Sequence, residues 1–228
     1  MIISIVGAVE SRKAVHEVER VLGNWSVEGQ VDAPVLPLLD AIKKTTKRHH
    51  PIEGKSQSDL VVGMLGPRRK DPDYMPASLG NSVLGQFGMM GRIGDAVREK
   101  SGLAYYAYSN LNAGIGPGSW EVNAGVNPKN LHRAIGLIEK ELRRFVKDGV
   151  TKAELADSQA NYIGRLPLSL ESNSGVAGAL INIEKYDLGL DYYQRYEDLV
   201  RAVTREEVLA AARKFIDPDR LVIATAGP

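Results

Sequence analysis

Two residues with complementary chemistry stand seven positions apart in the stretch GRIGDAVREKSGLAYYAYS, which runs from Gly91 to Ser109. Arg98 lies in the half with a helical pattern, and Tyr105 lies just inside the half with a strand pattern. A guanidinium is a rigid fork of donors, and a phenol is a single directional donor. Folded toward one another, the two can hold a peptide carbonyl and stabilise the negative charge that develops on its oxygen during attack. Neither group supplies a nucleophile.

The same two residues also have a purely structural interpretation. Arg98 can form a local ion pair with Asp95 or Glu99, as surface arginines commonly do. Tyr105 can be half-buried in a sheet beside the neighbouring tyrosines, where aromatic residues are frequent. Spacing alone favours this interpretation over the catalytic one.

The histidines do not predict a metal site. None of the four, which are His16, His49, His50 and His132, stands in an HxxEH or HExxH frame, the spacing that brings two imidazoles and a glutamate to one helix face. His16, with glutamates one and three positions further on, and the His49-His50 pair are both interpreted as surface residues. We therefore expect no zinc and no other cofactor in this chain.

Several other classes of function lack their sequence signals. The chain has 228 residues, 29 of them basic and 28 acidic, and no cysteine, so thiolate nucleophiles and cysteine-bound metals are excluded. The charges are mixed along the chain, which argues against a nucleic-acid or membrane-surface partner. The sequence has no GxSxG elbow, phosphate loop or dinucleotide fingerprint.

The start of the chain predicts a strand and a helix rather than a targeting segment. MIISIVGAVE is too short to span a bilayer and lacks a basic region before it, and no other segment has transmembrane length. A helix with an apolar stripe then runs to Gly23. Residues 24–40 carry Gly29, Pro34 and Pro37 without a period, which indicates a linker. We expect a soluble chain with a domain boundary there, although the sequence leaves its compartment open.

Residues 41–228 predict a complete α+β domain. Apolar and β-branched runs indicate strands at 43–50 and 59–65, which we expect to pair, and a hairpin at 103–110 and 119–126. Helical periodicity covers 71–88, 92–100 and 131–145, and capping boxes at 151–154 and 204–207 open further helices. An apolar strand follows at 220–226. The expected fold is one mostly antiparallel sheet with helices packed on one face.

The two ends of the chain have similar patterns. IISIVGAVE near the start and LVIATAGP at the end are both apolar runs that close on a small residue and a glycine. One interpretation is that residues 1–40 hold the closing strand-helix unit of a preceding domain plus a linker, so that the chain is the latter part of a tandem. Chance similarity between short strands explains the pattern equally well.

Several motifs together resemble a known family. The stretch from Gly91 to Ser109 is followed by SWEVNAGV, NPKNLHRAIGLIEKEL and DGVTKAEL, in the order and spacing found in the second domain of insulinase/pitrilysin-type zinc peptidases. MIISIVGAVESRKAVHEVERVLGNW resembles the unit that closes the preceding domain in that family. The resemblance runs from about Ile2 to Gly227, and its most specific part is the Arg98 and Tyr105 pair in a GR…VREK.GLAY frame.

The resemblance implies a divided active site. In this family two homologous halves close around a peptide, and one half binds zinc through HxxEH and a downstream glutamate. The other half carries the arginine and the tyrosine, so Arg98 would anchor a substrate carbonyl and Tyr105 would donate a hydrogen bond to the attacked carbonyl or its oxyanion. This chain lacks HxxEH, so it is expected to be inactive as a hydrolase by itself, with zinc in an HxxEH-bearing partner half or subunit and a polypeptide as substrate.

The resemblance leaves alternatives open. Relatives in respiratory complexes keep the fold as a scaffold without peptidase activity, and a free-standing peptide-binding module is a further alternative. An isolated open half is also expected to self-associate, for instance as a homodimer. The segment LGQFGMMG at 84–91 lies where the non-catalytic subunit of the mitochondrial processing peptidase has a glycine-rich loop, although here it is shorter and poorer in glycine.

Overall fold

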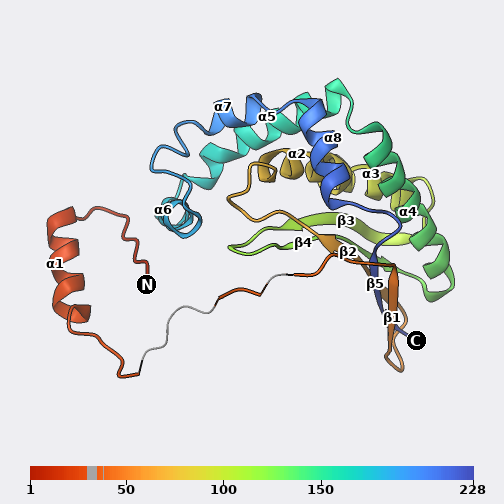
Figure 1. Cartoon of the computed structure of the whole chain (residues 1–228), viewed down its shortest axis with the longest axis horizontal. Coiled ribbons are helices and arrows are strands. Elements are labelled where there is room, and N and C mark those ends of the chain that lie inside the picture. The colour runs from red at the N-terminus through yellow and green to blue at the C-terminus, as the bar shows by residue number, and fades with distance from the viewer. Residues whose placement is uncertain (30–34, 38) are drawn as a thin grey trace.

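The structure, a computed structural model, describes residues 1–29, 35–37 and 39–228. Figure 1 shows the helices from residue 74 onward on one side of a twisted sheet, with the first helix away from it. In chain order the elements are α1 (Ser11–Leu22), β1 (Thr46–Pro51), β2 (Ser58–Leu65), α2 (Tyr74–Gly85), α3 (Phe87–Gly94), the π-helical turn η1 (Asp95–Glu99), β3 (Ala104–Asn112), β4 (Ser119–Val126), the 3-10 turn η2 (Pro128–Asn130), α4 (Leu131–Asp148), α5 (Lys152–Ser169), α6 (Asn173–Tyr186), α7 (Tyr196–Arg201), α8 (Arg205–Phe215) and β5 (Val222–Gly227).

The described strands form one five-stranded sheet in the order β1-β5-β2-β4-β3. The β1 and β5 strands are parallel, and all other neighbours are antiparallel, which confirms the expected α+β fold and the β3-β4 hairpin. The expected pairing of the first two strands is wrong, because β5 lies between β1 and β2. The polar sequence TKRHHP of β1 suits an edge, whereas VIATAG in β5 is small and apolar enough for an interior position.

One face of the sheet forms the core together with α2. Side chains alternate along β2 and β4, so that Leu60, Val62, Trp120 and Val122 are buried beneath the helices. The residues of α2 from Pro76 to Gly85 are all buried, because the sheet covers this helix on one side and α5 and α8 pack against it. The expected capping boxes that open α5 and α8 are both present.

A buried polar contact holds α2 to the sheet. The side-chain oxygen of Asn81 accepts hydrogen bonds from Trp120 Nε1 at 2.9 Å and from Ser109 Oγ at 2.6 Å. All three residues are at most 2% exposed. Because buried donors need acceptors, this contact fixes how α2 lies across β3 and β4.

The opposite face of the sheet is more accessible. We call it the open face; it carries half-buried residues of β2, β3 and β4, namely Asp59, Val61, Tyr106, Tyr108, Asn110, Glu121 and Asn123. The helices α2, α3 and α4 contact the described strands and lie on the other side (Figure 1). The open face therefore has polar and aromatic side chains available for a partner.

The first 29 residues form a separate feature. Residues 1–6 have no regular structure, so the strand expected there is not formed, and no described strand offers it backbone hydrogen bonds. The helix α1 does form, but it has no buried residue and lies away from the sheet (Figure 1). Its Val15 and Val18 line a cavity together with Val176 and Leu180 of α6. No helix within the described ranges combines the length and apolar character needed to cross a bilayer.

Candidate functional site

Arg98 lies on an irregular helical turn. The chain leaves α3 and continues as the π-helical turn η1, in which the Lys100 N–H donates to the Asp95 carbonyl at 2.9 Å. Single π-helical turns are rare and occur frequently at functional sites. Val97 is fully buried and fixes the turn to the core, while the Arg98 side chain keeps 31% of its surface exposed.

A tight connection brings the chain from η1 back along the sheet. The Gly102 N–H donates to the Arg98 carbonyl at 2.8 Å, and the Leu103 N–H donates to the Val97 carbonyl at 3.0 Å. Gly102 has a φ of 61°, a left-handed conformation that strongly favours glycine. As a result, β3 begins directly beside η1, and the two elements pack against each other.

Tyr105 lies at an irregularity of its own. Ala104 is opposite Val126 and Tyr106 is opposite Gly125, so Tyr105 is the extra residue of a β-bulge. A bulge interrupts the alternation of side chains and is a common way to redirect one of them next to an active site. The Tyr105 side chain is 83% exposed, so the expectation of a half-buried tyrosine is wrong.

The surroundings of Arg98 bear out one part of its structural interpretation. Arg98 Nε lies 3.5 Å from a carboxylate oxygen of Glu99, an exposed contact of small energetic value. Asp95 instead pairs with Lys100 at 2.5 Å. Within the described ranges no hydrogen bond or ion pair joins the side chains of Arg98 and Tyr105, so the fold brings their elements together and leaves both groups accessible.

A polar cluster on the open face supports the bulge. The Tyr106 hydroxyl donates to Asp59 Oδ1 at 3.1 Å, and the same carboxylate accepts from Lys55 and Gln57. The bond from Lys55 contributes most to lowering the pKa of Asp59, while burial and the nearby carboxylate raise the pKa of Tyr106. The Tyr106 ring lies over Gly125, where an added Cβ would be 2.6 Å from it.

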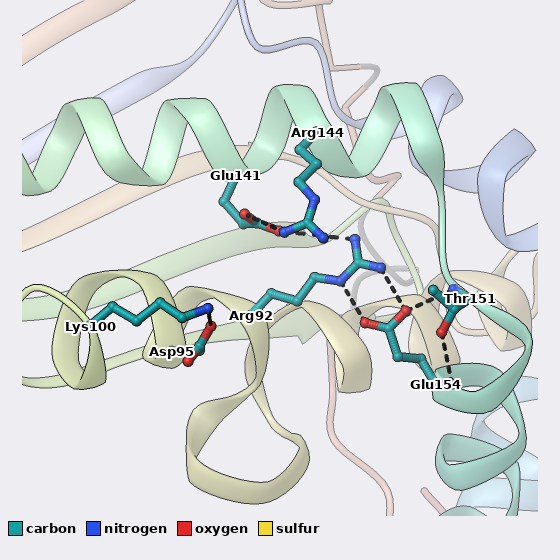
Figure 2. A network of polar contacts seen from close by, with 7 residues as sticks. All are labelled: Arg92, Asp95, Lys100, Glu141, Arg144, Thr151 and Glu154. Carbon is teal, nitrogen blue, oxygen red and sulfur yellow. Dashed lines mark hydrogen bonds and ion pairs between the residues drawn. The ribbon is translucent and has the colours of Figure 1, made fainter.

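An arginine that the sequence reasoning did not single out anchors the helical side of the site. Figure 2 shows Arg92 of α3 pointing between α4 and the start of α5. Its Nε and Nη2 donate to the two carboxylate oxygens of Glu154 at 2.7 and 2.6 Å. Glu154 also accepts the Thr151 N–H at 2.7 Å in the capping box of α5, and these contacts lower its pKa to about 2.

The second carboxylate beside Arg92 is held differently. Glu141 Oε1 lies 3.9 Å from Arg92 Nη1, and both atoms are buried without a hydrogen bond among the described residues. Burial raises the pKa of Glu141, although Arg144 and Arg92 oppose the effect. The sequence signal for this network is the capping box at Thr151 and Glu154, and it does not show that Glu154 meets Arg92.

The histidines do not converge on a metal site. His16 lies on α1, His49 and His50 are neighbours on the edge strand β1, and His132 is on α4. The ring of His49 lies 2.9 Å from the hydroxyl of Thr225, an ordinary polar contact. In the part of the chain that the structure describes, no three histidine, aspartate or glutamate side chains gather as metal ligands. These residues therefore do not fit zinc.

Comparison with known proteins places these features in a family. Residues 1–162 match the family model described as the peptidase M16 inactive domain. An uncharacterized zinc protease of Streptomyces coelicolor is 28% identical over 95% of this chain, and one of Bacillus subtilis is 27% identical over 96%. The match covers 48% and 52% of those two proteins, so the chain spans about half the length of these curated relatives.

Solved structures agree with this placement. A peptidase M16 inactive domain from Pseudomonas fluorescens is 29% identical, with a TM-score of 0.81 over 97% of this chain and 52% of that one. A protease from Helicobacter pylori has a TM-score of 0.83 over 98% of this chain and 54% of that one, but at 19% identity it shows the fold alone. The chain belongs to the peptidase M16 inactive-domain family, the non-zinc half of the insulinase-type zinc peptidases.

Proposed function

We propose that this chain is the non-zinc half of an insulinase/pitrilysin-type metalloendopeptidase and completes an active site formed together with a zinc-bearing half. The observation that carries the proposal is the placement of Arg98 and Tyr105 on adjacent elements, one on a π-helical turn and the other at a β-bulge. Such irregularities cost stability and are found preferentially where a side chain has a functional position. Because the sequence has no HxxEH motif to supply the zinc-bound water and its general base, we expect the chain by itself not to hydrolyse peptides.

Each of the two residues has a role that its surroundings allow. Arg98 has five N–H donors, and its ion pair with Glu99 occupies little of that capacity, so it can anchor a backbone carbonyl of the substrate. Tyr105 is exposed and can donate its hydroxyl proton in a hydrogen bond to the oxygen of the attacked carbonyl. The partner half supplies the zinc and the nucleophilic water.

The partner half is also expected to cover the exposed apolar side chains of residues 1–25. Exposed apolar side chains occur on both halves of this segment, namely Ile2, Ile3, Ile5, Val15, Val21 and Trp25. Clustered exposed apolar residues usually mark a protein interface. We propose that residues 1–40 are the closing strand-helix unit of the preceding domain plus its linker, and that the preceding zinc-bearing domain provides the strand partner that residues 2–6 lack.

Reconstitution tests the proposal. The chain is purified and assayed on an unfolded polypeptide, alone with added zinc and then with increasing amounts of the zinc-bearing half. We expect no turnover by either part alone and activity that saturates as the two are combined. Hydrolysis by the chain alone, or a zinc-bearing half whose activity does not change on addition of the chain, would contradict the proposal.

A further inference from the structure

A cavity outside the Arg98 and Tyr105 region contains unneutralised positive charge. It has a volume of about 310 Å³ and lies between the loop after β2, the helix α5 and the start of α7. Its polar lining comprises Arg69, Arg165, Ser169 and four tyrosines, which are Tyr162, Tyr192, Tyr193 and Tyr196. No carboxylate from the described residues lines it. We refer to it as the arginine–tyrosine cavity.

Arg69 is enclosed by aromatic rings rather than by acids. Its guanidinium lies 4.1 Å from the ring centre of Tyr74 and 5.3 Å from that of Tyr192. One of its N–H groups donates to the Tyr192 hydroxyl at 2.9 Å, and this is the only side-chain hydrogen bond of Arg69 within the described ranges. Because a guanidinium has five N–H donors, several of them remain for a ligand.

The other groups that line the cavity also offer positive charge and hydrogen-bond donors. The described residues contain no ion-pair partner for Arg165, which is exposed at the mouth of the cavity. The hydroxyls of Tyr193 and Tyr196 make no hydrogen bonds with the described residues. Burial raises the pKa of Tyr196 to about 12, so its hydroxyl stays a donor at neutral pH. The neighbouring cavity on the other side of Arg69 differs, since Asp71, Asp187 and Glu207 line it.

From this arrangement we propose that the arginine–tyrosine cavity binds an oxyanion, a carboxylate or a phosphate group, through Arg69 and Arg165. Guanidinium groups match both anions in shape and charge, and tyrosine rings suit a flat group attached to the anion. None of the residues that line this cavity belongs to η1 or β3. The site is therefore independent of the residues proposed to act on a peptide.

Binding by the purified chain tests the site. Phenyl phosphate, benzoate and inorganic phosphate are titrated by calorimetry, with phenol as the neutral analogue. We expect saturable binding of at least one anion with a Kd below about 10 mM, and much weaker binding of phenol. A preference for phenyl phosphate and inorganic phosphate identifies a phosphate site, and a preference for benzoate identifies a carboxylate site. Equal binding of phenol, or no saturable binding of any anion, would overturn the proposal.

Substitutions locate the site. Arg165→Gln removes an exposed charge without disturbing the core, and we expect it to weaken anion binding about fivefold to tenfold, whereas Arg69→Gln should weaken it more. The matched control is Arg201→Gln on α7, an arginine that pairs with Glu197 outside the cavity and should leave binding unchanged. If Arg69→Gln does not fold, Arg165→Gln still decides the matter. Unchanged affinity in Arg165→Gln would refute the assignment.

Discussion

Arg92 and Glu154 form a two-point ion pair in which both carboxylate oxygens accept from the guanidinium, at 2.7 and 2.6 Å (Figure 2). Because Glu154 also completes the capping box of α5, a single carboxylate ties α3 to the start of that helix. The turn η1, which carries Arg98, follows α3 without a break, so this contact also fixes the position from which η1 starts.

Glu154→Gln should lower the free energy of unfolding at neutral pH by on the order of 1 kcal/mol, because it weakens a charge-assisted pair whose arginine is nearly buried and whose carboxylate is partly exposed to solvent. The pKa of Glu154 is about 2 in the folded chain, below its ordinary value of 4.5. Its stabilisation is therefore complete above about pH 4.5 and is lost as the pH falls toward 2. Urea unfolding at several pH values should show the two proteins converging in acid.

Glu141→Gln is the matched control for that experiment. Glu141 lies beside the same arginine, but burial raises its pKa, so its charge is not well compensated. Because folding disfavours its charged form, Glu141→Gln should not show the loss expected of Glu154→Gln at neutral pH, and the wild-type chain should gain stability relative to it as the pH falls through the raised pKa. A larger loss in Glu141→Gln would show that the 3.9 Å contact, rather than the two-point pair, holds α3 in place.

Gly125→Ala should destabilise the open face. The added Cβ would lie 2.3 Å from Gln57 Nε2 and 2.6 Å from the Tyr106 ring, so the ring must move and its hydrogen bond to Asp59 is lost. We expect a loss of about 1–3 kcal/mol in the free energy of unfolding. Gly136→Ala on α4 is the control, because nothing lies within 4 Å of its added Cβ and helix propensity should stabilise it slightly. Equal effects would disprove the crowding at Gly125.

Asn81→Ala should be among the most damaging single substitutions. It leaves the indole N–H of Trp120 buried without an acceptor, and the Ser109 hydroxyl keeps only its longer bond, 3.3 Å, to the backbone carbonyl of residue 81. We expect a loss of about 2–4 kcal/mol, measured by thermal and urea unfolding. Asn112→Ala, at the exposed end of β3, should change stability by less than about 1 kcal/mol. Similar losses in both would mean that the buried contact adds little.

Deletion of residues 1–25 tests whether this segment contributes to binding of the zinc-bearing half rather than to folding. Because α1 has no buried residue, the remaining chain should keep its melting temperature within a few degrees. Its affinity for the zinc-bearing half should fall at least tenfold, since exposed apolar area is lost from the proposed interface. Full affinity after deletion would contradict the role proposed for this segment, and loss of folding would show that it belongs to the core.

Local patterns predicted much of the fold. The β3-β4 hairpin and the two capping boxes depend on residues close in sequence, and all of them are present. The position of β5 between β1 and β2 was missed, because strand order depends on contacts between distant segments. The strand expected at residues 2–6 is absent for a related reason, since an apolar pattern cannot supply its own hydrogen-bond partner.

The site was predictable only in part. The resemblance selected Arg98 and Tyr105, but spacing alone indicated a half-buried tyrosine, and the bulge at Tyr105 leaves no clear trace in a run of three aromatics within four residues. Arg92 was missed because its partners stand 49 and 62 positions further along the chain. Ion pairs of that separation are set by helix packing.

The reconstituted enzyme provides the most direct test of the central claim. Arg98→Ala and Tyr105→Phe are each combined with the zinc-bearing half, and turnover is measured together with the melting temperature of the variant chain; Arg133→Ala, an exposed arginine on α4, serves as the control. Loss of a donor to a developing oxyanion reduces turnover on the order of a hundredfold, and we expect such losses with unchanged melting temperatures. Full turnover in both variants would remove the pair from the mechanism and favour a scaffold or peptide-binding role.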